Sequence, residues 1–169
     1  MSPVDPNQLT QLVDRYGGPL VLYGRQWCDT PEDVVQEAFL RLVRLPAVPE
    51  NPPAWLYRVV RNGAISASRS AVRRARRETA AARQGEPWFD ASPAEQLDAA
   101  AATAALEQLP IEQREIIVAR LWGGLSFEQI AELTGSTTTT VHRRYHEGLA
   151  GLRERLGVRC PKTKNRCEK

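Results

Sequence analysis

Apolar residues recur along almost the whole chain with the spacing of amphipathic helices. In the first segment they follow the i, i+3, i+4, i+7 pattern of a single helical face. This stripe consists of Leu9, Leu12, Val13, Tyr16, Leu20, Tyr23 and Trp27. Proline lacks the N–H that an inner helical turn requires, so we expect Gly17-Gly18-Pro19 to kink or divide the element.

A second helix is predicted from residue 31 onward. Thr30 suits the N-cap, Pro31 suits the first helical position, and two acidic residues follow where they complement the helix dipole. Its apolar face consists of Val35, Ala38, Phe39 and Leu42, and its opposite face of Asp33, Gln36, Glu37 and Arg41. The stretch Pro46–Pro53 contains four prolines and is predicted to be a loop. A third helix then runs from Ala54 into an arginine-rich stretch.

The last third of the chain has the pattern of a helix-turn-helix. Ile111–Trp122 is predicted as a helix that ends at Gly123-Gly124, and Ser126 with Gln129 fits a capping box. After Gly135, Thr137 can cap a final helix. The apolar stripe of that helix advances in steps of three and four and is assigned to packing: Val141, Tyr145, Leu149, Leu152 and Leu156.

These elements predict an all-α protein made of two small helical domains. The first domain covers residues 1–79, and the stretch 80–92 is interpreted as a flexible linker because it contains Gly85 and Pro87 with little periodicity. A linker of this length has a root-mean-square reach of roughly 20 Å. Ser92-Pro93 opens the second domain, residues 93–156, and a basic tail follows at 157–169.

Charge is distributed in blocks along the chain. Residues 61–84 carry seven arginines against one glutamate, whereas residues 85–119 carry seven acidic residues against one arginine. The net charge of +3 therefore hides a strongly basic block and a strongly acidic one. A localised positive face is typical of a protein that binds nucleic acid.

The final predicted helix carries groups that can read double-stranded DNA. Its packing stripe leaves threonines, histidines and arginines on the remaining surface: Thr138, Thr139, His142, Arg143 and His146, with Arg144 at the margin. Threonine can contact base edges and thymine methyls, and arginine can bind guanine or phosphate. The arginine block beside Trp55 and Tyr57 instead suits single strands, whose bases stack on aromatic rings. A duplex reader joined to a single-strand binder indicates a protein that helps to melt DNA.

Other classes of function find little support. His142 and His146 have the spacing of a zinc pair, but Arg143 stands where a zincin helix needs glutamate, so no metal site is predicted. No catalytic grouping and no phosphate-binding loop occurs, and we expect neither enzymatic activity nor a cofactor. No signal peptide and no apolar run near the ~18 residues of a membrane span is present, so a cytoplasmic protein is expected. The role of Cys160 and Cys167 in the tail stays open.

Two stretches resemble the extracytoplasmic-function sigma factors of the sigma-70 family. Pro31–Leu42 (PEDVVQEAFLRL) followed by Ala54–Asn62 (AWLYRVVRN) looks like region 2. Ala105–Glu115 (ALEQLPIEQRE), Gly124–Ala131 (GLSFEQIA) and Thr140-Val141 resemble region 4. Both occur in the family's order, and together they cover roughly residues 9–156. The recognition helix departs from the family pattern in its run of four threonines, in His142 and in Tyr145.

The resemblance implies an alternative sigma factor, which binds the core of bacterial RNA polymerase and directs promoter recognition, strand opening and initiation. The core-binding residues would be Asp33, Gln36, Glu37 and Arg41. The minus-10 strand would contact Trp55, Arg58, Arg61, Asn62 and Arg69. The minus-35 duplex would contact Thr138, Thr139, His142, Arg143 and Arg144. The resemblance leaves open whether an anti-sigma factor is a further partner.

Two alternatives compete with this interpretation. A stand-alone helix-turn-helix regulator would bind duplex DNA without polymerase, usually as a dimer on paired half-sites. A polymerase-binding decoy would occupy the core enzyme and start no transcript. The face from Asp33 to Arg41 discriminates a sigma factor from the stand-alone regulator, because only a polymerase-bound protein needs it. A decoy would share this face and is distinguished by the absence of a transcript.

Overall fold

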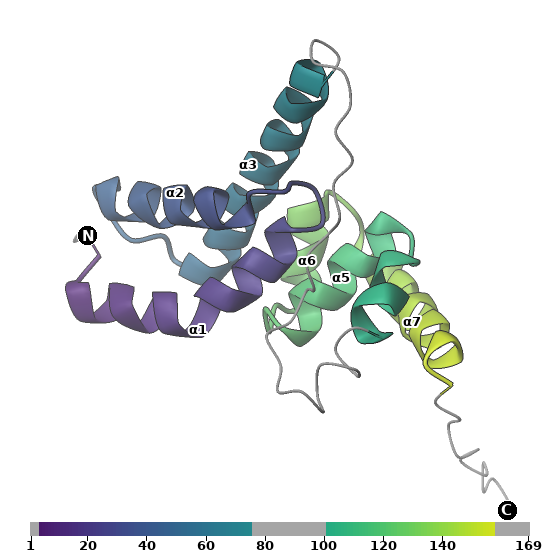
Figure 1. The fold of residues 1–169 in the computed structure, drawn as a ribbon. Coiled ribbons are helices and arrows are strands. Elements are labelled where there is room, and N and C mark those ends of the chain that lie inside the picture. Colours follow the sequence, from purple (N-terminus) through teal and green to yellow (C-terminus); the bar gives the residue numbers. More distant parts are fainter. Residues whose placement is uncertain (1–3, 76–100, 158–169) are drawn as a thin grey trace, which may run out of the picture.

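The computed structural model describes residues 4–75 and 101–157, and all of their regular structure is helical (Figure 1). In chain order the helices are α1 (Pro6–Gly24), α2 (Pro31–Arg44), α3 (Pro52–Ala75), α5 (Ile111–Leu121), α6 (Phe127–Thr134) and α7 (Thr138–Arg155). Residues 101–107 are helical as well. The two described ranges contain no strand, and the all-α prediction is confirmed. The expected linker, the start of the second domain at Ser92-Pro93 and most of the tail lie outside these ranges.

Helices α1, α2 and α3 pack against one another as an N-terminal bundle. Helix α1 continues through Pro19 without a break, and Figure 1 shows it changing direction part-way along. The expected bend at Pro19 is therefore present, and the helix is not divided into two. Leu20 and Tyr23, one turn beyond the glycines, are fully buried against the other two helices.

The loop between α2 and α3 is shorter than expected. Pro52 and Pro53 belong to the first turn of α3, so the prediction of a loop through Pro53 is wrong at its end. Proline fits the first turn because the N–H groups there have no helical partner. Asn51 stabilises this start, since its Oδ1 accepts a hydrogen bond from the backbone N–H of Ala54 at 3.1 Å.

The helix-turn-helix forms with the predicted caps. The Ser126 side chain accepts a hydrogen bond from the N–H of Gln129 at 3.2 Å, and the Gln129 side chain accepts one from the N–H of Ser126 at 2.8 Å. Gly135 ends α6 with φ at 67°, a left-handed conformation that favours glycine. Thr137 caps α7 through the N–H of Thr140. The predicted stripe of α7 is buried at Val141, but its last member, Leu156, is 42% exposed.

One hydrophobic core continues through both halves of the described chain. It joins residues of the N-terminal bundle to Ile116, Ala119 and Ile130 of the C-terminal helices. Helix α1 packs on α5 and α3 packs on α6. The approach is close at Gly123, where a Cβ atom would lie 2.6 Å from the ring of Tyr57. The two predicted domains therefore lie together as one packed body.

Within residues 4–75 and 101–157, no helix combines the length and the apolarity that a membrane span requires.

Candidate nucleic-acid interface

Helix α7 presents the predicted duplex-reading residues to solvent. Thr138, Thr139, His142 and Arg143 are exposed, and Arg144 is half-buried. Arg143 donates a hydrogen bond from Nη1 to Oε1 of Glu147 at 2.8 Å, which holds its guanidinium along the helix. The polar surface of α7 is therefore exposed, and the guanidinium of Arg143 is paired with a carboxylate of its own helix.

An aromatic cluster fixes the angle between α6 and α7. The Phe127 ring of α6 meets Tyr145 edge-on at a centroid distance of 5.3 Å and His142 at 5.1 Å. The Arg120 guanidinium lies over the same ring, 4.8 Å from its centre. Val141 of α7 is fully buried in the core, so the side of α7 that carries it faces inward and the polar side faces outward.

The two histidines of α7 contact each other. Their Nε2 atoms are 3.1 Å apart, so one imidazole donates the hydrogen bond and the other accepts it. Among the residues that the structure describes, no group of three or more His, Cys, Asp or Glu side chains is arranged to hold a metal ion.

Helix α3 carries the residues predicted to meet the minus-10 strand. Asn62 and Arg69 are exposed on this helix. Trp55 is half-buried and packs against the shared core, so part of its ring is committed to folding. Arg58 is exposed, and its Nη2 lies 3.8 Å from Oε2 of Glu132 on α6. This loose ion pair joins the two halves at the surface.

Arg61 belongs to a buried polar contact between the two halves. Its Nε donates to Oε1 of Glu115 at 2.6 Å, and its Nη2 lies 3.5 Å from Oε2. The Tyr23 hydroxyl donates to the same Oε1 at 2.6 Å. Glu115 is only 4% exposed, so its charge depends on these two donors. Arg61 also lies over the ring of Trp27, 5.9 Å from its centre.

The ionisation of these groups reflects their burial. Burial raises the pKa of Tyr23 well above its ordinary value, and the neighbouring Glu115 carboxylate raises it further. Burial by itself lowers the pKa of Arg61, but its hydrogen bond to Glu115 outweighs this and the pKa is raised. At physiological pH the Tyr23 phenol therefore stays neutral and the Arg61 guanidinium stays charged.

Glu115 and Tyr23 were missed as functional residues when the sequence was considered alone. The sequence contains a pattern that could have predicted a buried carboxylate at this position. Glu115 stands four residues from Ile111 and four from Ala119, on the apolar side of α5. A carboxylate at such a position needs a buried partner. The sequence did not show that this partner would be an arginine of the other half.

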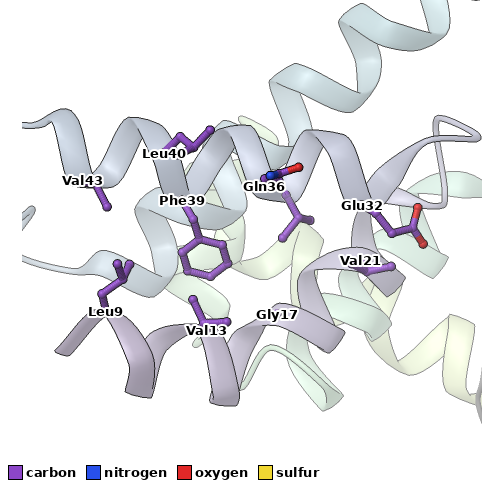
Figure 2. Close-up of a pocket in the computed structure, with 10 residues that line it drawn as sticks. Leu9, Val13, Gly17, Val21, Glu32, Gln36, Phe39, Leu40 and Val43 are labelled. Carbon is purple, nitrogen blue, oxygen red and sulfur yellow. The ribbon is translucent and has the colours of Figure 1, made fainter. Parts of the chain in front are cut away.

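The predicted polymerase face lies on α2. Asp33, Gln36 and Arg41 are exposed, and Glu37 is half-buried and accepts a hydrogen bond from Arg41 at 2.9 Å. Beside it a groove of about 370 Å³ runs between α1 and α2. Figure 2 shows Phe39 between the two helices, facing Val13 of α1, with Gln36 and Glu32 toward one end. Val13, Leu40 and Val43 at the groove are each more than 40% exposed.

Two family models match this chain, one in each half. Residues 12–77 match the family described as Sigma-70 region 2, and residues 99–152 match Sigma-70, region 4. The ECF RNA polymerase sigma factor SigL of Mycobacterium tuberculosis (strain ATCC 25618 / H37Rv) is 36% identical over 137 residues, covering 75% of this chain and 76% of that protein. The ECF sigma factor SigD of Mycobacterium bovis is 32% identical over 168 residues, covering 90% and 78%.

The chain belongs to the extracytoplasmic-function sigma factors. It is therefore a transcription initiation factor and not an enzyme, and both predictions made from the motifs are confirmed.

Solved sigma factors share the arrangement of the helices. The sigma factor RpoE from Bartonella quintana, solved with the anti-sigma factor NepR, superposes with a TM-score of 0.75 at 22% identity, covering 92% of this chain and all of that one. CnrH, solved with the cytosolic domain of CnrY, superposes with a TM-score of 0.58 at 25% identity, covering 92% of both chains. The first of these likenesses concerns the fold alone.

Tyr57 offers a test of the buried interface. Its ring meets Tyr23 edge-on at 4.8 Å, but its hydroxyl is buried without a hydrogen-bond partner among the described residues. Burial raises the pKa of this phenol, so above pH ~10 the folded protein retains a proton that the unfolded chain loses. The free energy of unfolding is therefore unaffected by this group below that pH, and it declines as the pH rises further.

We therefore expect Tyr57→Phe to leave the free energy of unfolding at pH 7 unchanged or higher, because it removes an unpaired buried hydroxyl. Between pH 9 and 11 (roughly spanning the ordinary tyrosine pKa) the variant should lose less stability than the wild type. Urea unfolding over this range measures both effects. An equal alkaline decline in the two proteins would contradict the assignment.

Proposed function

We propose that this sigma factor binds the core of RNA polymerase with one face of α2 and holds promoter DNA with α3 and α7. In this proposal residues 1–79 bind polymerase and the minus-10 element, residues 93–156 bind the minus-35 element, and residues 80–92 link them. Residues 157–169 form a basic tail. The observation that carries the proposal is that the two family-matched halves expose three separate polar surfaces, on α2 beside an apolar groove, on α3 and on α7.

The polymerase contact is assigned to Asp33, Gln36, Glu37 and Arg41. Their support is the neighbouring groove, where exposed Val13, Leu40 and Val43 leave apolar surface uncovered beside polar groups. Exposed apolar surface with a polar rim is typical of a protein-binding site. The charged and amide groups would then fix the orientation of the partner.

Strand opening is assigned to α3. Asn62 would capture an extruded base, the exposed part of Trp55 would stack, and Arg58, Arg61 and Arg69 would bind the phosphates of the separated strand. Unstacking costs only a few kcal/mol per base, so capture of the extruded base can hold the strands apart without nucleotide hydrolysis.

Duplex binding is assigned to α7. Thr138, Thr139 and His142 would face base edges in the major groove, with Arg143 and Arg144 at a base or at phosphate. The N-terminus of α7 would add its dipole and free N–H groups to a phosphate contact.

The remaining partners follow from the same assignment. A protein that works with polymerase on the chromosome acts in the cytoplasm. A relative in fold was solved with an anti-sigma factor, and we propose that this chain is controlled by such a protein as well. The assignment requires no cofactor and no metal.

A double substitution tests the polymerase face. We expect Gln36→Ala with Glu37→Ala to weaken binding to core polymerase by about 1–3 kcal/mol, the loss typical of interface residues. The matched control is Glu107→Ala with Gln108→Ala, an exposed pair of the same residue types in the other half of the chain. Co-purification with core enzyme and its dissociation constant are measured for both variants. Equal affinity of test and control variants would reject the assignment of α2.

Arg143→Ala tests the duplex reader. If Arg143 contacts a base, the variant should lose about 1–3 kcal/mol of binding to the minus-35 duplex and lose discrimination at one position. Arg153→Ala, at the far end of the same helix, removes the same charge and should retain that discrimination. Binding to a library of duplexes that differ at single positions gives both quantities. Uniform weakening across the library would identify a phosphate contact, and no weakening would remove Arg143 from the interface.

A further inference from the structure

His142 and His146 are the only two histidines of the chain, and both are exposed on α7, one helical turn apart. Their Nε2 atoms are 3.1 Å apart whereas their ring centroids are 4.4 Å apart, so the two rings converge at these nitrogens. A zinc ion lies about 2.0–2.1 Å from an imidazole nitrogen that binds it. The two nitrogens would therefore subtend an angle of about 100° at a shared ion, close to the angle of tetrahedral coordination.

Neighbouring aromatic rings hold both imidazoles in this arrangement. Phe127 of α6 meets His142 edge-on at a centroid distance of 5.1 Å, and Tyr145 meets His146 edge-on at 5.5 Å. Side chains that are already held in the binding geometry lose little conformational entropy when they bind a ligand. The pair can therefore take up an ion without rearrangement of α7.

The charges around the pair do not oppose a cation. Arg143 lies beside His142, but its guanidinium is paired with the Glu147 carboxylate at 2.8 Å, so the two charges offset each other. The sequence predicted no metal site because Arg143 replaces the glutamate of a zincin helix. That glutamate is a general base for hydrolysis and does not bind the metal. Its replacement therefore excludes zincin chemistry and leaves the two ligands intact.

From this geometry we propose that His142 and His146 bind Zn²⁺, with water in the remaining positions. Imidazole suits Zn²⁺ and its neighbours Ni²⁺ and Cu²⁺, whereas Mg²⁺ prefers oxygen ligands. Among the residues that the structure describes, no third metal-binding side chain joins the pair. A site with two protein ligands releases its ion more readily than a structural zinc site with four.

A bound ion withdraws His142 from DNA. This part of the inference rests on the proposed role of α7, in which His142 faces a base edge. A metal-bound Nε2 carries no proton and has used its lone pair, so it neither donates nor accepts a hydrogen bond. The positive charge of the ion still attracts phosphates of any sequence. Zn²⁺ therefore reduces discrimination between duplexes more than it reduces overall affinity.

Zinc uptake is measured first, by titration calorimetry with zinc chloride and without DNA or polymerase. The full chain is used without an affinity tag and with Cys160→Ser and Cys167→Ser, so that the thiols of the tail bind no ion. We expect this parent chain to bind one Zn²⁺ and no Mg²⁺. His146→Ala should weaken zinc binding about a hundredfold, because attachment at two points is lost.

The matched control is His146→Ala with Ala150→His, which keeps two histidines at exposed positions of α7. It places them eight residues apart, about 12 Å along the helix, too far to share one ion. This variant should bind Zn²⁺ as weakly as His146→Ala alone. Absence of zinc binding by the parent chain, or equal binding by the matched control, would overturn the proposal.

The effect on DNA is measured next, with duplexes that differ at single positions. Saturating Zn²⁺ should lower the discrimination of the parent chain at one position to that of His142→Ala, and it should not change the discrimination of His146→Ala. Unaltered discrimination by the parent chain would overturn the withdrawal of His142. If the parent chain shows no discrimination even without Zn²⁺, the proposed role of α7 fails, whereas calorimetry still decides the zinc site.

Discussion

Glu115 is a carboxylate that the fold has almost completely removed from water, and both of its donors come from the other half of the chain. Tyr23 reaches it from α1 and Arg61 reaches it from α3. A buried charge of this kind is tolerable only while its partners remain in place. The position of the C-terminal helices on the N-terminal bundle depends on this contact, because the carboxylate and its two donors come from opposite halves.

Such a contact holds two bodies together without making their association irreversible. Desolvation of the carboxylate and the guanidinium offsets much of their attraction, so a buried ion pair contributes little net stability. It does specify orientation, because a shifted interface would leave the charges unpaired.

The local structure was predicted well because its causes are local. The capping box of Ser126 and Gln129, the left-handed Gly135 and the cap at Thr137 each act within four residues, and all are present. The errors arose where contacts with residues distant in the sequence determine where a helix begins or whether a side chain is buried. Pro52 and Pro53 were assigned to a loop although an N-terminal turn accepts proline, and Leu156 was assigned to the core although nothing covers it fully.

The sequence predicted the polar faces of α3 and α7 separately, but it did not predict that α5 and α6 would pack against α3. Helical periodicity placed Arg58, Arg61 and Asn62 on α3 and the polar residues on α7, and the family motifs gave each face a role. Periodicity cannot show that α5 and α6 would turn their carboxylates toward α3. That information lies in contacts between residues more than fifty positions apart, such as Arg61 and Glu115.

This chain gives RNA polymerase its choice of promoter. Run-off transcription with purified core polymerase on a library of genomic fragments, with and without the protein, tests it most directly. New transcripts with defined start sites should appear only when the protein is added, and they should share upstream elements at the minus-10 and minus-35 positions. Identical RNA from both reactions across the whole library would contradict it.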